Sequence, residues 1–168
     1  SGNTADSGGG ISNGGNLTVN NSSISKNTAG DGGGIYNSAR KGGGIGTVNI
    51  SNSTITGNKA SSNGGGIYNG GGNYNGRFGG STGTVVTVSN STISGNSATG
   101  SGGGIFNDSF NTTVSVSNST ISNNAASKYD GGGISNGGTA TVSNSTLSGN
   151  TGRGGGGINN TGSLTVAN

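Results

Sequence analysis

The sequence predicts an all-β protein, a right-handed single-stranded parallel β-helix, on three observations. The tetrapeptide Gly-Gly-Gly-Ile starts at residues 8, 32, 64, 102, 131 and 155, and each Ile is followed two residues later by Asn. The stretches between the copies contain short runs in which apolar and polar residues alternate. Charged residues make up only 7% of the chain, so charge repulsion does not keep it unfolded. A motif that keeps its internal spacing at these six positions indicates stacked coils rather than a flexible glycine-rich linker.

The shortest interval between copies, the 24 residues from position 8 to position 32, defines the basic coil. It contains three short alternating segments, Ile11–Asn13, Leu17–Asn21 and Ile24–Asn27. Alternation with a period of two over β-branched residues is a strand signal. We therefore expect a solenoid whose basic coil has three short strands and three turns. The coil should be right-handed, as crossovers between parallel strands are.

Stacking such coils brings like residues into inward columns about 4.8 Å apart. The first column contains Ile11, Ile35, Ile67, Ile105, Ile134 and Ile158. The second contains Val19, Ile50, Val88, Val116, Val142 and Val166, and the third contains Ile24, Ile55, Ile93, Ile121 and Leu147. A solenoid needs few apolar residues, because each coil buries its small core against the next.

Three sets of asparagines are expected to mark the turns. The first is Asn13, Asn37, Asn69, Asn107, Asn136 and Asn160. The second is Asn21, Asn52, Asn90, Asn118, Asn144 and Asn168, and the third is Asn27, Asn58, Asn96, Asn124 and Asn150. Asn tolerates left-handed backbone, and its amide can bond to the same amide above and below, so we expect all three sets to form ladders. The triple glycine would allow a tight turn at positive φ.

The residues in excess of the basic coil are expected at one corner of three neighbouring coils. They form insertions at 38–47, 70–85 and 108–113 in a single β-helix of about six coils that spans residues 1–168. Both ends stop within a coil. We therefore expect the solenoid either to continue in a longer chain or to stack end to end on copies of itself, since open strand edges favour further pairing.

These motifs carry a family resemblance. The Gly-Gly-Gly-Ile-x-Asn segment, followed by segments such as LTV-x-N and NSTISGN, resembles the repeats of secreted right-handed parallel β-helix proteins of bacteria. These are the proteins of the polymorphic outer membrane protein and autotransporter-passenger type, and the resemblance covers nearly all of the chain. It implies an extracellular or bacterial cell-surface location and an adhesive or structural role. It carries over no catalytic residue, because that family shares none.

An aromatic row is the first candidate site. The residue after each column-one Ile should point outward, and in the three coils with insertions it is Tyr36, Tyr68 or Phe106. The insertions add Tyr74, Phe78 and Phe110 together with Arg40, Lys41 and Arg77. The loops could fold back over the row as a small satellite core. Alternatively, these nine residues could form a contact patch for a glycan or a neighbouring subunit, since aromatic residues and Arg are enriched at interfaces.

Hydroxyl columns form the second candidate. Ser23, Thr54, Thr92, Thr120 and Thr146 precede the third column, and Ser25, Thr56, Ser94, Ser122 and Ser148 follow it. The two columns resemble the Thr-x-Thr face of solenoid antifreeze proteins, although small hydroxyl residues also suit any solvated strand. The Asn-Ser-Thr sequons that start at Asn52, Asn90, Asn118 and Asn144 are expected to be structural, because their Asn residues belong to an inward turn column where a glycan would break the stacking.

Catalysis has little support in the composition. The chain has no His, Cys or Glu, and its acids are Asp6, Asp31, Asp108 and Asp130, of which only Asp6 and Asp31 are expected near each other. Paired carboxylates for glycoside hydrolysis or Ca²⁺ binding are therefore not predicted, and neither is any cofactor. The seven cations are scattered, which argues against a nucleic-acid partner, and no apolar run is long enough to span a membrane.

The sequence thus favours a non-enzymatic structural protein of the bacterial exterior, a β-helical rod or a filament-forming subunit that stacks end to end. The alternative is an adhesin segment that binds a surface glycan or protein through its corner loops. A third hypothesis is ice binding by the Ser/Thr face.

Overall fold

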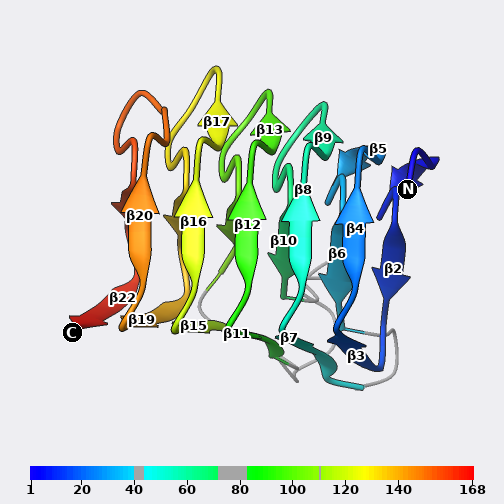
Figure 1. Ribbon diagram of the computed structural model, residues 1–168, viewed down its shortest axis with the longest axis horizontal. Coiled ribbons are helices and arrows are strands. Elements are labelled where there is room, and N and C mark those ends of the chain that lie inside the picture. The colour runs from blue at the N-terminus through cyan, green and yellow to red at the C-terminus, as the bar shows by residue number, and fades with distance from the viewer. Residues whose placement is uncertain (40–43, 72–82, 110) are drawn as a thin grey trace, which may run out of the picture.

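The protein is described by a computed structural model that covers residues 1–39, 44–71, 83–109 and 111–168. Every regular element in these residues is a β-strand, and every strand pairing is parallel. In Figure 1 the chain rises along the front sheet, crosses the top and descends at the back, while advancing from the N-terminal end to the C-terminal end. The fold is therefore a right-handed parallel β-helix, as the repeat predicts.

Four parallel sheets run along the solenoid, and the chain passes through them in the order A, B, C, D, with five strands in sheets A and D and six in sheets B and C. Sheet A contains β1 (Thr4–Ser7), β5 (Thr28–Asp31), β9 (Lys59–Ala60), β13 (Ser97–Ala98) and β17 (Ala125–Ala126). Sheet B contains β2 (Ile11–Asn13), β6 (Ile35–Ser38), β10 (Ile67–Gly70), β14 (Ile105–Asn107), β18 (Ile134–Asn136) and β21 (Ile158–Asn160).

The other two sheets meet at the lower front edge in Figure 1. Sheet C contains β3 (Asn16–Asn20), β7 (Gly46–Ser51), β11 (Thr84–Ser89), β15 (Thr112–Ser117), β19 (Thr139–Ser143) and β22 (Ser163–Ala167). Sheet D contains β4 (Ser23–Ser25), β8 (Thr54–Thr56), β12 (Thr92–Ser94), β16 (Thr120–Ser122) and β20 (Thr146–Ser148).

The expected count of three strands per coil is wrong, because sheet A adds a fourth. Its strands are two to four residues long and lie between sheet D and the glycine corner. Their inward residue is always alanine, in the column Ala5, Ala29, Ala60, Ala98 and Ala126. A strand this short, with a single small apolar residue, gives no alternating signal in the sequence.

The three predicted inward columns are confirmed residue by residue. Ile67 pairs with Ile35 on one side and Ile105 on the other, Val88 with Ile50 and Val116, and Ile93 with Ile55 and Ile121. Most of these side chains are fully buried and form one continuous core. The tetrapeptide alone does not create a coil, however. It occurs again at residues 42–45, where Ile45 is 53% exposed and belongs to no column.

Two of the three asparagine sets form buried ladders. In the first set, Nδ2 of Asn37 donates to Oδ1 of Asn69 over 2.9 Å, and Asn69 repeats the bond to Asn107 over 2.8 Å. In the third set, Asn58 donates in the same way to Asn96 over 3.0 Å. Nδ2 of Asn37, Asn58 and Asn69 also donates to a nearby backbone carbonyl. The ladders therefore satisfy polar groups inside the solenoid, as buried polar groups require.

The second asparagine set does not form the predicted ladder. Asn21, Asn52, Asn90, Asn118 and Asn144 are exposed at the corner between sheets C and D and have φ values of 45° to 49°. Asn tolerates this left-handed conformation better than other side chains do. The expectation that the sequon asparagines point inward is therefore wrong. The second asparagine set makes the tight left-handed turns, and the first and third sets make the amide ladders. The two roles are separate because a left-handed corner residue directs its side chain outward here.

The glycine triplets bring the coils into close contact. The first glycine of the triplet has φ near 65° in the coils of Gly32, Gly64 and Gly102. The second glycine of the triplet does not have a positive φ. A Cβ on Gly33, which is the second glycine of its triplet, would however lie 2.5 Å from the carbonyl oxygen of Gly65. Only glycine allows the backbones of successive coils to approach in this way.

Candidate functional site

The predicted aromatic row exists on the outer face of sheet B. Tyr36, Tyr68 and Phe106 are register neighbours on β6, β10 and β14, and each is half-buried. The rings of Tyr36 and Tyr68 are stacked with centroids 5.0 Å apart, and Phe106 lies 5.3 Å from Tyr68 at a tilt of 34°. Such pairs add about 0.5–1.5 kcal/mol beyond the area they bury. The row therefore joins three successive coils.

The stacking limits what the row can bind. Both faces of the Tyr68 ring are covered by neighbouring rings, and a Cβ on Gly70 would collide with Cε1 of Tyr68. Glycine at position 70 thus provides the space in which the Tyr68 ring lies along its strand. Because a sugar stacks on an aromatic face, a ligand on Tyr68 would reach only the ring edge.

Asp108 completes the row and was not predicted as part of it. The Tyr68 hydroxyl donates a hydrogen bond to Oδ2 of Asp108 over 3.2 Å, from one coil to the next. Burial, followed by the charge of Asp108, raises the pKa of Tyr68 far above its ordinary value. Burial also raises the pKa of the Asp108 carboxyl, which the hydrogen bond from Tyr68 opposes. The sequence contained one signal for this contact, which is the position of Asp108 directly after the ladder residue Asn107.

The long connections leave the strands that carry this row. They join β6 to β7, β10 to β11 and β14 to β15, each time from sheet B to sheet C. The other six residues of the predicted patch, Arg40, Lys41, Tyr74, Arg77, Phe78 and Phe110, lie outside the described residues. Whether these residues cover the row or extend it as a contact patch therefore stays a prediction.

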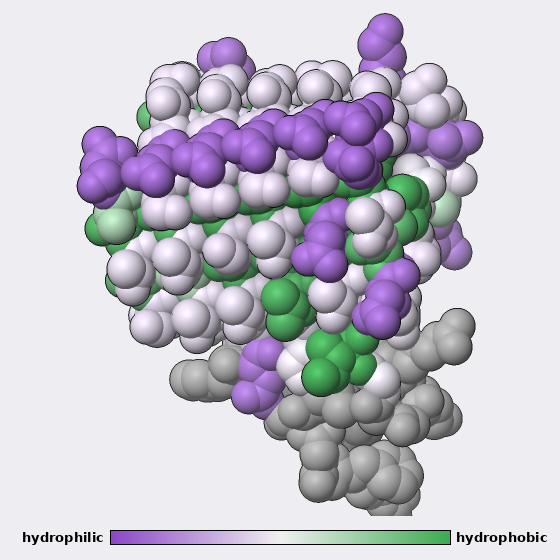
Figure 2. Space-filling model, turned by 60° about the horizontal axis from the view of Figure 1, so that its bottom comes forward, coloured by the Kyte–Doolittle hydropathy of each residue, from purple (hydrophilic) through white to green (hydrophobic). Residues whose placement is uncertain are grey.

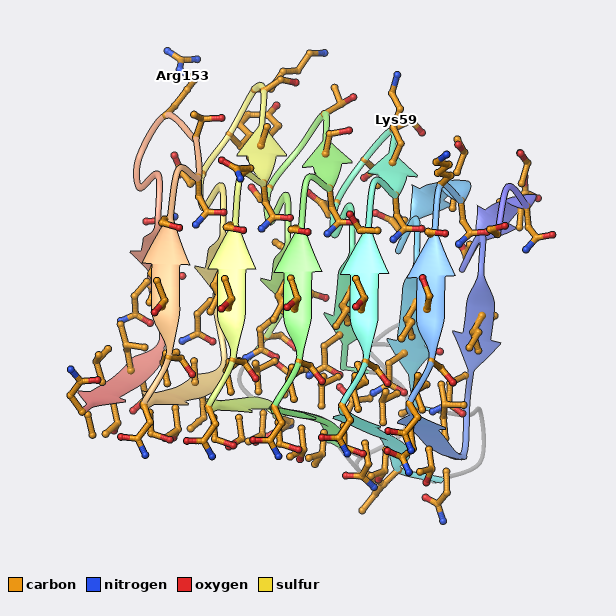
Figure 3. All side chains as sticks on the ribbon, viewed as in Figure 1. Lys59 and Arg153 are labelled. Atoms are coloured by element: carbon orange, nitrogen blue, oxygen red, sulfur yellow. The ribbon has the colours of Figure 1, made fainter. Side chains whose placement is uncertain are left out.

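The predicted hydroxyl columns lie on the outer face of sheet D, visible at the front of Figure 3. Thr92 pairs with Thr54 and Thr120 in one column, and Ser94 pairs with Thr56 and Ser122 in the other. The described strands of sheets C and D contain no charged residue. Figure 2 shows pale Ser/Thr rows on either side of a hydrophilic row at the corner between these sheets.

The Asn-Ser-Thr sequence at this corner has a structural explanation. The middle serine closes the turn, as when Oγ of Ser91 donates to the carbonyl of Ser89 over 2.7 Å. The same Oγ accepts the backbone N–H of Ser53 from the preceding coil over 3.0 Å. The Asn takes the left-handed conformation at the corner. The Ser makes the hydrogen bond between coils, and the Thr points outward from the next strand. The repeat thus generates the sequons for structural reasons, although their asparagines are accessible.

Charges concentrate around sheet A. Of the described cations, Lys59 lies on β9, and Lys26, Lys128 and Arg153 lie in turns next to that sheet. Figure 3 labels Lys59 and Arg153, whose side chains point away from the body along the same margin.

In the described residues no three His, Cys, Asp or Glu side chains gather as a metal site, and no helix is long and apolar enough to cross a membrane.

The comparisons with known proteins identify the repeat. The model of the Chlamydia polymorphic membrane protein repeat matches residues 21–38, 52–70 and 90–108. Each matched stretch starts at the C–D corner asparagine, runs through sheets D and A into sheet B, and ends two residues after the aromatic residue. No curated protein and no solved structure matches the chain.

The matched repeat and the solenoid fold are typical of structural or surface proteins rather than enzymes, and they indicate the outer membrane or cell surface. Three matched repeats, stacked parallel coils and two buried asparagine ladders together fit a β-helix repeat protein similar to the polymorphic outer membrane proteins.

Proposed function

We propose that the chain is a structural component of the bacterial exterior, a β-helical rod whose coils stack end to end into a filament. The role is mechanical. Backbone pairing, apolar columns and asparagine ladders continue from coil to coil, so tension along the axis is shared by many parallel bonds. Solenoid stability grows in this way through interfaces between neighbouring repeats.

The observation that carries this proposal is the unbroken register of the coils. Ile67 pairs with Ile35 on one side and with Ile105 on the other, and Asn37, Asn69 and Asn107 continue one amide ladder through the same three coils. Every coil that repeats this register buries further apolar area at about 25 cal/mol per Å². The repeated contacts favour growth by addition of further coils.

Electron microscopy of the 168-residue chain tests the proposal. We expect continuous fibres with an axial repeat of about 4.8 Å, the spacing of stacked strands. Val166→Lys should abolish fibres, because it places a charge in the second inward column, where a further coil would pack. Thr165→Lys is the matched control, since residue 165 is exposed on the outer face of the same strand. Discrete short particles from the unmodified chain would exclude the filament.

An adhesin is the second candidate, favoured by the position of the aromatic row on the three strands from which the long connections leave. Its ligand would be a surface glycan or protein bound at the corner between sheets B and C. A glycan array provides the test. A signal lost in Tyr68→Ser and kept in Tyr129→Ser would support it, because Tyr129 is 61% exposed and lies in a turn away from the row. Loss in both variants, or no signal, would argue against it.

A further inference from the structure

The corner asparagines between sheets C and D carry a repeated tripeptide. Asn52, Asn90, Asn118 and Asn144 are each followed by Ser-Thr, and Asn21 is followed by Ser-Ser. Asn-x-Ser/Thr is the acceptor motif of N-glycosylation when x is not proline. All five asparagines are exposed, and the hydrophilic row at this corner in Figure 2 runs along the solenoid. The motif therefore lies in one accessible line.

The left-handed backbone at this corner tolerates asparagine but does not require it. Two other corners of the coils also have positive φ, and glycine fills most of those positions, as at Gly57 and Gly95 between sheets D and A and at Gly64 between sheets A and B. Glycine adopts this conformation without steric strain. At all five described C–D corners, however, the residue is asparagine. The asparagine side chain thus needs an explanation beyond the turn.

The side chains of these asparagines make few contacts. Within the described residues, Asn52 makes the one side-chain hydrogen bond of this set, to an asparagine of sheet C over 3.4 Å. The hydroxyls of Thr54, Thr92 and Thr120, two residues after the asparagines, lie on the outer face of sheet D and have no hydrogen-bond partner in the same part of the chain. The serine between them is buried and bonds between coils, as Ser91 does. The amide and the last hydroxyl, which define the acceptor motif, therefore both face solvent.

A buried sequon in the same chain shows the contrast. Asn107 starts Asn-Asp-Ser, but it is 0% exposed and its Nδ2 donates to Oδ1 of Asn136 over 2.7 Å. A sugar on this nitrogen would disrupt the ladder and would need space inside the solenoid, which a close-packed interior lacks. A sugar on Asn90 would project into solvent and break no side-chain bond within the described residues. The fold thus separates acceptors from a non-acceptor with the same motif.

The strand spacing limits the size of each glycan. Corner asparagines of neighbouring coils belong to strands about 4.8 Å apart. Branched glycans are bulky, and two of them on neighbouring coils would overlap at this spacing. Single hexoses fit this spacing with their rings stacked face to face along the axis. The geometry therefore favours one sugar for each corner.

We propose that the corner asparagines are acceptors for N-linked single hexoses, which form a ridge of sugars along the C–D corner. The donor is a nucleoside-diphosphate hexose, used by a separate transferase. Nδ2 of the asparagine forms a bond to C1 of the hexose, the bond from C1 to the diphosphate oxygen breaks with its electron pair, and Nδ2 gives one proton to solvent. The modification suits a role at the bacterial exterior and does not require the filament.

Peptide mass mapping of the chain isolated from the cells that make it tests the proposal. We expect a mass increase of one hexose residue for each of Asn52, Asn90, Asn118 and Asn144, located on the asparagine by fragmentation. Asn107 should carry no sugar and is the internal control. Unmodified corner asparagines, a hexose on Asn107, or branched glycans on neighbouring corners would overturn the proposal.

Three variants in the coil of Asn90 separate the motif from the fold. Thr92→Ala should remove the hexose from Asn90 and keep it on Asn118, because it deletes the hydroxyl of one motif and leaves the left-handed corner intact. Thr92→Ser should keep both, since serine also completes the motif. Thr87→Ala is the matched control, because Thr87 lies on the outer face of sheet C in the same coil and belongs to no sequon. A hexose that stays on Asn90 in Thr92→Ala, or that is lost in Thr87→Ala, would refute recognition of the motif.

Discussion

Asn96 is the position at which the buried ladder is best tested. It is 1% exposed, its Nδ2 donates to Asn124 Oδ1 and to the carbonyl of Ile55, each over 3.0 Å, and its Oδ1 accepts two bonds from Asn58. Asn96→Ala removes all four. The backbone N–H of Asn58 loses the acceptor that it contacts at 2.9 Å, and Ile55 loses a donor.

The expected cost follows from these losses. A buried polar group left unpaired costs about 1–3 kcal/mol, and the cavity left by the amide adds to it. We therefore expect Asn96→Ala to lower the free energy of unfolding by about 3 kcal/mol, a large fraction of the roughly 5–15 kcal/mol typical of a folded domain. Equilibrium denaturation in urea measures the change, with an unchanged m-value as the sign that the transition itself is the same.

Asn90 provides the matched control in the same coil. It is exposed at the left-handed corner with φ of 48°, a conformation that glycine also adopts readily. Asn90→Gly should therefore change stability by less than about 0.5 kcal/mol, and Asn90→Ala should cost about 1 kcal/mol. A loss below about 1 kcal/mol for Asn96→Ala, or one no larger than that of Asn90→Ala, would refute the ladder argument.

Three further predictions concern the glycine corner and the aromatic row. Gly65→Ala should cost several kcal/mol in the same denaturation assay, because its Cβ would lie 2.5 Å from the Ser97 carbonyl oxygen, whereas Gly15→Ala, with open space around its Cβ, should be close to neutral. Because burial raises the pKa of Tyr68, its contribution to stability is complete below about pH 10 and is lost as the pH rises further. Folded Tyr68→Phe should then match the original chain in phenolate absorbance up to about pH 11, and a deficit at pH 10 would contradict the burial. The raised pKa of Asp108 gives stability that is complete below about pH 4 and is lost as the pH rises through its folded value. Asp108→Asn should therefore gain stability relative to the original chain between pH 4 and neutral pH in urea denaturation, and a constant difference would contradict this.

Much of the architecture could be predicted because a parallel solenoid stacks equivalent residues. The spacing of Ile35, Ile67 and Ile105 in the sequence is also their register in sheet B, so counting from the motif predicts which residues touch. The same counting correctly predicts the Asn69 and Asn96 ladders. Counting from the motif does not predict sheet A, because alanine in a two-residue strand carries too little apolar signal.

The candidate site was only partly predictable. The position after each column-one Ile predicts that Tyr36, Tyr68 and Phe106 share an outer face, because side chains alternate along a strand. Ring stacking depends on the side-chain rotamers and on the space above Gly70, which no local pattern encodes. The bond from Tyr68 to Asp108 links residues 40 positions apart, and its geometry depends on how the third connection leaves β14.

The sequence by itself determined the repeat, the three large apolar columns and the sets of asparagines that align, because repetition along the chain becomes register between coils. Only the tertiary structure decided what each set does. Asn69 and Asn96 turn inward and bond to their neighbours, whereas Asn90 turns outward at a left-handed corner. The chemistry of the residue is the same in all three cases. The backbone conformation at each corner, set by the packing of four sheets rather than three, selects between a ladder and a solvent-exposed turn.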